Sequence, residues 1–213
     1  MLQNTPLSIL AVFLGSYLVG SIPWGYLIGR LNGIDIRKYG SHNIGATNVT
    51  RVLGAGYGRL CFVLDFLKGW FPVVFFGGRF SERLALGAGW CALIAAAAAV
   101  IGHVFPVWLK FKGGKGVATS VGVCLAMAFW PVVIGGLAWF IVYRKTLVVA
   151  IASLTLAVVT PLSALALRLT GLSHIHWHAI LLMFLLGALI IVRHHENIRR
   201  LVRGEENSFK AKA

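Results

Sequence analysis

Apolar segments long enough to cross a lipid bilayer recur along this chain, and they constrain its fold more than any other feature. The first covers residues 7–29 and contains about 23 residues, which is enough to span about 30 Å of hydrocarbon. Hydrophobic residues make up 58% of the chain and charged residues only 12%, whereas ordinary soluble domains contain about 25% charged residues. The sequence therefore predicts an all-α integral membrane protein. The first segment lacks the basic start and cleavage site of a signal peptide, so we expect it to remain as an anchor.

The remaining apolar segments predict seven transmembrane helices within a single domain, residues 1–213, with no internal repeat. The later passes are expected at residues 60–76, 84–101, 117–142, 147–167 and 179–192. Residues 117–142 could form one long helix or two short helices broken at Trp130 and Pro131. Two halves of about 13 residues would each be about 20 Å long, which predicts short helices in thinned or shielded surroundings.

The distribution of cations decides between these topologies. The chain carries 20 Lys and Arg residues against 6 Asp and Glu, a net charge of +14. With two passes in residues 117–142, 16 cations gather on one side, and only Arg79, Arg83 and Arg168 lie on the other. The positive-inside rule then places the N-terminus outside and the C-terminus in the cytoplasm. A chain this apolar is a poor nucleic-acid binder, so we expect its cations to face lipid headgroups or anionic substrates.

A basic, glycine-rich stretch between two apolar segments is the first candidate for chemistry. Residues 102–119 read GHVFPVWLKFKGGKGVAT, in which Gly113, Gly114 and Gly116 alternate with Lys112 and Lys115. Glycines allow backbone N–H groups to turn toward a phosphate, and two ammonium groups add charge. The stretch is not a Walker A loop, because Gly116 rather than Ser or Thr follows the second lysine. The alternative is an ordinary basic cytoplasmic loop.

Two further polar clusters are predicted on the same face of the membrane. The first lies in GSHNIGATNVTR at residues 40–51, and the other follows residue 192; their candidate residues are Ser41, Asn43, Thr47, Asn48, Arg51, His194, Asn197, Arg199 and Arg200. If a helix continues past Val192, His194 and Asn197 project from one side of it. Turn formation by Asn43 and Asn48, and headgroup binding by the two arginines, remain alternatives.

Several polar residues inside or beside the apolar segments have competing interpretations. Asp65 and Lys68 are three residues apart, so we expect them to pair in the protein interior, for structure or for function. His103 could be a base or a helix-end residue. The string His174, His176 and His178 lies in a predicted outer loop without carboxylate or cysteine neighbours, which favours interfacial histidines over a metal site. The three cysteines, Cys61, Cys91 and Cys124, are interpreted as small apolar residues.

The three polar clusters closely resemble the motifs of the bacterial acyl-phosphate:glycerol-3-phosphate acyltransferases of the PlsY type. GSHNIGATNVTR is similar to the first motif of that family, GHVFPVWLKFKGGKGVAT to the second and HHENIRRLVRGEE to the third. His42 stands where the family often has glycine or another small residue. The resemblance implies a bacterial cytoplasmic-membrane enzyme that moves an acyl group from acyl phosphate to the 1-hydroxyl of sn-glycerol 3-phosphate. The product is 1-acyl-glycerol 3-phosphate, in the first acylation of phospholipid synthesis.

Carried onto this chain, the resemblance implies an active site at the cytoplasmic face. The implied catalytic residues are Ser41, Arg51, Lys115, His194 and Asn197, and the implied substrate-binding residues are Asn43, Thr47, Asn48, Lys68, Lys112, Gly113, Gly114 and Arg200. The cations suit phosphate binding, and Ser41 and Asn197 suit positioning and oxyanion stabilisation. No catalytic triad is evident, so we expect direct transfer without an acyl-enzyme, cofactor or metal. The expected partners are glycerol 3-phosphate, acyl phosphate and membrane lipid, with a monomer as the working expectation. A transporter of anions or phospholipids is the alternative function.

Overall fold

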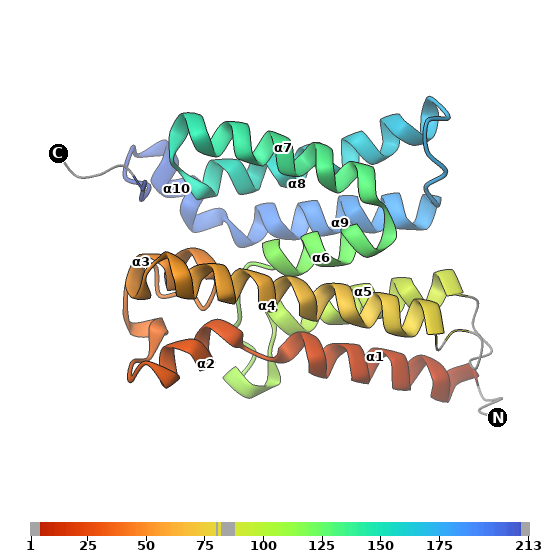
Figure 1. The fold of residues 1–213 in the computed structure, drawn as a ribbon, viewed down its shortest axis with the longest axis horizontal. Helices are drawn as coiled ribbons and strands as arrows, with labels where there is room; N and C mark the ends of the chain where they lie inside the picture. Colours follow the sequence, from red (N-terminus) through yellow and green to blue (C-terminus); the bar gives the residue numbers. More distant parts are fainter. Residues whose placement is uncertain (1–4, 80, 82–87, 210–213) are drawn as a thin grey trace. The chain divides into compact units, whose positions relative to one another are not determined.

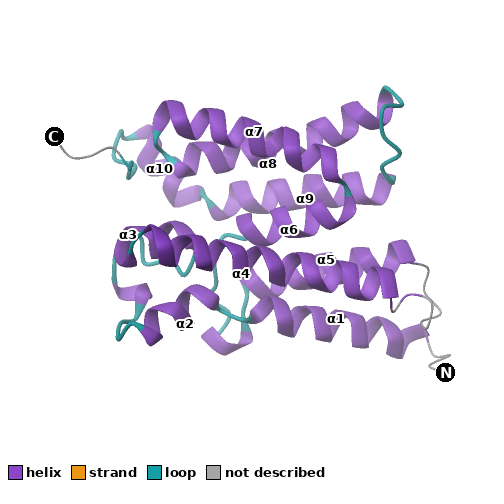
Figure 2. Cartoon of the chain, viewed as in Figure 1, coloured by secondary structure: helices purple, strands orange, loops and turns teal. Residues whose placement is uncertain are grey.

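The computed structural model describes residues 5–79, 81 and 88–209, and this part of the chain is helical throughout, with connecting turns and loops and no strand (Figures 1 and 2). The chain divides into two compact units, Met1–Met127 and Ala128–Ala213. The all-α prediction is therefore confirmed for the described residues. Residues 82–87 lie outside them, and with them the predicted outer residue Arg83 and the start of the predicted 84–101 segment.

The first unit packs its helices in pairs. α1 lies against α5, and α4 lies against α3, α5 and α6. The bounds of these elements are α1 Thr5–Ser21, α2 Trp24–Leu31, η1 Ile36–Lys38, α3 Ala46–Leu53, α4 Ala55–Val74, η2 Phe75–Arg79, α5 Ala88–Val104, η4 Val107–Leu109 and α6 Val117–Met127. The predicted 7–29 segment is thus broken between α1 and α2, at Ile22 and Pro23, because a proline ring disfavours helical backbone in the residue before it.

Small residues allow these helices to approach backbone to backbone. A side chain at Gly20 in α1 would collide with the carbonyl oxygen of Ala99 in α5, and one at Gly69 in α4 would collide with that of Thr119 in α6. Ala95 and Ala98 in α5 are completely buried. Packing through small residues is the usual way in which membrane helices associate.

The second unit is an antiparallel helical arrangement in which α8 packs against both α7 and α9 (Figure 1). Its helices are α7 Phe129–Thr146, α8 Val149–Leu169, α9 Trp177–Arg193 and α10 His195–Val202. Close contacts again depend on glycine, because a side chain at Gly187 in α9 would meet the carbonyl oxygen of Ala157 in α8.

The predicted division of residues 117–142 is confirmed, but its predicted position is wrong. The helix breaks at Ala128, whose backbone is extended with φ −158° and ψ 116°, and not at Trp130 and Pro131. Pro131 falls in the first turn of α7, where its missing N–H would have no intrahelical partner. The two helices contain 11 and 18 residues instead of about 13 each, because α7 continues to Thr146.

Among the described residues, four segments are long and apolar enough to cross a membrane: Pro6–Leu31, Ala55–Gly78, Gly89–Leu109 and Val149–Leu169. The pair α9 and α10 makes a fifth if its bend of 57° is counted within one span. These spans support a multi-pass membrane protein. Seven passes and their orientation remain predictions.

Candidate functional site

The first polar cluster is organised around the buried amide of Asn48, in the first turn of α3. Its Oδ1 accepts a hydrogen bond of 2.7 Å from the N–H of Ser41, and its Nδ2 donates to the carbonyl oxygens of Ile36, Tyr39 and Asn43 at 2.8–3.1 Å. A side chain at Gly40 would collide with the same amide. One side chain therefore holds the whole loop that enters the cluster.

Replacing Asn48 with alanine should loosen this loop, since the N–H of Ser41 and three backbone carbonyl oxygens each lose one hydrogen bond together. At about 0.5–1.5 kcal/mol for each hydrogen bond lost, we expect a loss of at least about 2 kcal/mol in unfolding free energy. Thermal unfolding in detergent would measure this. Asn43→Ala is the matched control, because the Asn43 side chain accepts only one described hydrogen bond, from the N–H of Gly45, and its loss should have a clearly smaller effect. Equal stability of the two variants would contradict the assignment.

The remaining residues of the first cluster surround this loop and are partly exposed. Ser41 and Asn43 lie in the loop itself, whereas Thr47 and Arg51 lie on α3. The turn chemistry considered for Asn43 and Asn48 is what their side-chain amides do in the structure. Ser41, Thr47 and Arg51 are therefore the members of this cluster best placed to meet a ligand.

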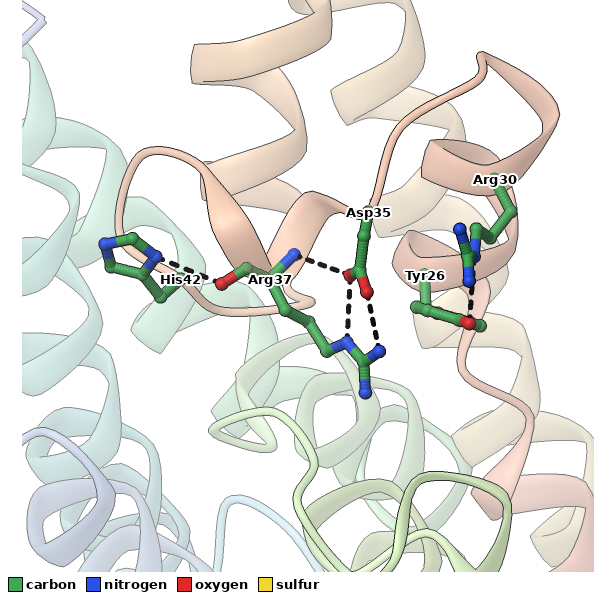
Figure 3. A network of polar contacts seen from close by, with 5 residues as sticks. All are labelled: Tyr26, Arg30, Asp35, Arg37 and His42. Carbon is green, nitrogen blue, oxygen red and sulfur yellow. Dashed lines mark hydrogen bonds and ion pairs between the residues drawn. The ribbon is translucent and has the colours of Figure 1, made fainter.

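His42 occupies a left-handed backbone position with φ 55°. Glycine adopts this conformation most easily. The imidazole Nδ1 of His42 lies 3.0 Å from the carbonyl oxygen of Arg37, so the side chain supports the loop (Figure 3).

A charged brace precedes the first cluster (Figure 3). The Asp35 carboxylate accepts hydrogen bonds from the Arg37 side chain at 2.9 and 2.6 Å and from its backbone N–H at 3.1 Å. The Arg37 guanidinium also lies 4.6 Å from the centre of the Tyr26 ring, and Arg30 donates to the Tyr26 hydroxyl at 2.9 Å. The brace therefore links α2 to η1.

The Arg37 side-chain hydrogen bonds hold the pKa of Asp35 well below its usual range. Because the carboxyl pKa is lower in the folded than in the unfolded protein, the brace stabilises the fold above the ordinary Asp pKa of about 3.9 and loses this effect as the pH falls below it. We expect amide protection factors for η1 to fall in that acid range. The Asp35→Asn variant should show low protection of η1 at every pH. If its protection instead fell with acid as it does in the native protein, the Asp35–Arg37 pair would not be the cause.

The second cluster uses its glycines for close packing. The N–H groups of Gly113 and Gly114 donate to the carbonyl oxygens of Val104 and His103, both at 3.1 Å, at the end of α5. The expectation that these N–H groups turn toward a ligand is therefore wrong for both glycines, since they complete the carbonyl hydrogen bonds of a helix end. Gly116 has φ +86°, which favours glycine.

The lysines of the second cluster are more accessible than its glycines. Lys112 is exposed and Lys115 partly exposed, and Lys115 follows the anchored Gly114 directly. The chemistry that this stretch offers a phosphate therefore comes from ammonium groups rather than from a nest of backbone N–H groups.

Asp65 and Lys68 form a buried ion pair on α4, as predicted. Lys68 Nζ lies 2.7 Å from Asp65 Oδ1 and donates at 2.7 Å to the carbonyl oxygen of Ile22. His103 Nδ1 lies 3.8 Å from the same carboxylate oxygen, and all three side chains are nearly inaccessible. Removing one member of such a buried pair costs about 3–5 kcal/mol, because the other charge is left uncompensated.

The third cluster lies in the second unit, around the junction of α9 and α10. The predicted helix past Val192 is not continuous, because the chain bends by 57° at His194. His194 is buried, with Nδ1 2.8 Å from the carbonyl oxygen of Ile190, and Asn197 is buried in the first turn of α10.

Glu206 is a member of the third cluster that the sequence analysis missed. Its carboxylate accepts hydrogen bonds from Asn197 Nδ2 and Arg200 Nε, both at 2.8 Å, and its side chain is 6% exposed. The segment that carries it folds back after Gly204, whose φ is +71°, and Phe209 N donates to the carbonyl oxygen of Leu147. The sequence signal was the GEE that ends the third motif. A buried carboxylate thus orients two of the predicted site residues.

Comparison with known proteins decides the family. A model of the family described as glycerol-3-phosphate acyltransferase matches residues 10–204. The chain belongs to this family. A relative from Aquifex aeolicus named glycerol-3-phosphate acyltransferase is 41% identical over 91% of this chain and 95% of its own length, and one from Rubrobacter xylanophilus is 42% identical over 95% and 96%.

Solved structures agree with this assignment. The crystal structure of PlsY, an integral membrane glycerol 3-phosphate acyltransferase, in its glycerol 3-phosphate form is 40% identical, with a TM-score of 0.83 over 95% of this chain and 96% of that one. Its lysophosphatidic acid form is 39% identical, with a TM-score of 0.81 over 95% of both chains. The predicted PlsY-type resemblance is thereby confirmed.

Proposed function

We propose that this protein transfers a fatty acyl group from acyl phosphate to the 1-hydroxyl of sn-glycerol 3-phosphate, giving 1-acyl-glycerol 3-phosphate and phosphate. The observation that carries the proposal is the match, over 95% of the chain, to structures of an acyltransferase in forms named for glycerol 3-phosphate and lysophosphatidic acid. These are the acceptor and the product of the proposed reaction. The cation-rich composition is consistent with two substrates that both carry phosphate.

We assign the residues that meet substrate from all three clusters. Arg51, Lys112 and Lys115 would bind phosphate oxygens by charge-assisted hydrogen bonds, with Thr47 nearby on α3. Ser41 and Asn197 would position the acceptor and stabilise the oxyanion, and His194 would orient the reacting groups. Contacts of these kinds would hold the hydroxyl of one substrate and the acyl carbon of the other in a reactive orientation.

Other predicted substrate-binding residues act indirectly in this proposal. Asn43 and Asn48 hold the loop of the first cluster, and Gly113 and Gly114 anchor the second at the end of α5. Lys68 is buried in its ion pair. Arg200 is oriented by Glu206 and would contribute positive charge beside Asn197.

Acyl transfer by purified protein is the direct test. Incubation with glycerol 3-phosphate and acyl phosphate should yield 1-acyl-glycerol 3-phosphate, identified by mass spectrometry of the lipid products. Glycerol without phosphate is the matched control acceptor and should give little product. Absence of the acylated product with both native substrates would contradict the proposed function.

A transporter of anions remains the second candidate from sequence, but the family assignment favours the enzyme. Uptake of labelled glycerol 3-phosphate distinguishes a transporter from an acyltransferase. Sealed vesicles containing the protein should accumulate no labelled glycerol 3-phosphate beyond protein-free vesicles, whereas the detergent-solubilised protein should still transfer acyl groups.

We propose one transmembrane domain in the bacterial cytoplasmic membrane, with seven passes and the three clusters in the cytoplasm. The motivation is the division of 16 cations against 3 that this topology produces. Cysteines introduced at Lys145 and at Gly204 should both resist a membrane-impermeant thiol reagent added outside intact cells, and both should react after lysis. Labelling of only one of them from outside would contradict the topology. The native cysteines are buried and leave a low background.

A further inference from the structure

We infer that Lys68, Asp65 and His103 form a positioning network that sets the phosphate-binding geometry of the first two clusters. The inference rests on the proposed function and extends it, because none of the three side chains is needed to touch substrate. Lys68 and Asp65 come from α4 and His103 from the last turns of α5. All three belong to the first compact unit.

The centre of the network is one carboxylate oxygen. Asp65 Oδ1 lies 2.7 Å from Lys68 Nζ and 3.8 Å from His103 Nδ1, while Asp65 Oδ2 lies 3.7 Å from the thiol of Cys61. The three residues are 3–4% exposed, so water cannot substitute for any of these contacts. The 2.7 Å ion pair orients the carboxylate on α4, and the approach of His103 brings the end of α5 against this buried charge.

His103 links the network to the second cluster. Its carbonyl oxygen accepts the N–H of Gly114 at 3.1 Å, and a Cβ at Gly114 would collide with its ring. The imidazole therefore packs directly beneath the backbone that precedes Lys115. A ring that shifts, or is absent, removes the support on which the position of this lysine depends.

Cys61 links the network to the first cluster, and Lys68 links it to the break before α2. The Cys61 thiol also lies 3.9 Å from the carbonyl oxygen of Ile44, inside the loop that Asn48 holds. Lys68 Nζ donates a hydrogen bond to the carbonyl oxygen of Ile22, the residue that follows α1. A single buried carboxylate thus links the backbone of both phosphate-facing clusters within the first unit.

Steady-state kinetics of four variants test the inference. His103→Ala and Asp65→Asn should raise the KM for glycerol 3-phosphate or for acyl phosphate at least tenfold, with kcat changed much less. His103→Asn retains a polar side chain near the Asp65 carboxylate, so it should recover most of the lost affinity. Ser153→Ala, a buried polar change in α8 of the second unit, is the control and should keep the native KM.

The double variant Asp65→Leu with Lys68→Met separates positioning from stability, because it leaves no uncompensated charge. It should fold, as judged by thermal unfolding, and still show the raised KM. Native KM values in the folded double variant and in His103→Ala would overturn the inference while leaving the proposed function intact. A native protein that transfers no acyl group to glycerol 3-phosphate would overturn both.

Discussion

Replacing either Arg51 or Lys115 with alanine is expected to remove nearly all acyl transfer while the protein remains folded. Each side chain is proposed to make a charge-assisted hydrogen bond to phosphate, and the loss of one such bond costs about 1.5–3 kcal/mol. Since about 1.4 kcal/mol corresponds to a factor of ten, the loss of kcat/KM should exceed tenfold for each variant. Misalignment of the reacting groups would enlarge it further.

Matched controls make this result specific. Arg59→Ala and Lys38→Ala each remove one exposed cation from the same unit, outside the proposed site, and should keep near-normal activity. Arg51→Lys preserves charge but not the planar pair of donors, so it should fall between the native protein and Arg51→Ala. Near-native activity in both Arg51→Ala and Lys115→Ala would contradict the proposal that these side chains bind substrate phosphate.

Local spacing predicted the parts of the fold that depend on one helix. The separation of three residues between Asp65 and Lys68 places both on one helix face, and the structure shows their buried ion pair. The break in residues 117–142 was predicted from charge, but its predicted position at Trp130 and Pro131 was wrong, because Pro131 is compatible with the first turn of a helix.

The contacts of the candidate site depend on segments that are distant in sequence, and these could not be read from spacing. Nothing local indicates that the N–H groups of Gly113 and Gly114 return to the end of α5. The same holds for Glu206, which meets Asn197 only because the chain turns back after Gly204. In each case a helix end or a bend brings together polar groups whose partners a linear pattern does not specify.

The chemistry of the donor gives the second large expected effect: the protein should use acyl phosphate efficiently and acyl-CoA hardly at all. Common CoA-dependent glycerolipid acyltransferases use a histidine with an aspartate five positions later, and no histidine of this chain has one. An acyl phosphate is already activated, with phosphate as its leaving group. The enzyme therefore needs mainly to position its substrates and to stabilise developing charge.

The attacking hydroxyl must still lose a proton, and a substrate can accept it. The second pKa of a phosphate monoester is about 6, close to the value that suits a general base near neutral pH. We therefore propose direct, substrate-assisted transfer, in which a phosphate oxygen takes the proton as the hydroxyl oxygen bonds to the acyl carbon and the phosphate leaves. His194 is the alternative base, and its Nδ1 contact with the carbonyl oxygen of Ile190 fixes the orientation of its ring.

Parallel assays with acyl phosphate and acyl-CoA of equal chain length test this mechanism. The rate with acyl-CoA should be at least a hundredfold lower, because the site offers no general-base pair of the CoA-dependent type. Intact-protein mass spectrometry during turnover should detect no acyl adduct, and EDTA should leave the rate unchanged. Efficient turnover of acyl-CoA, or an acyl group trapped on Ser41, would contradict direct transfer from acyl phosphate. Inhibition by EDTA that is reversed by added metal would instead indicate a metal site, for which His174, His176 and His178 are the candidates.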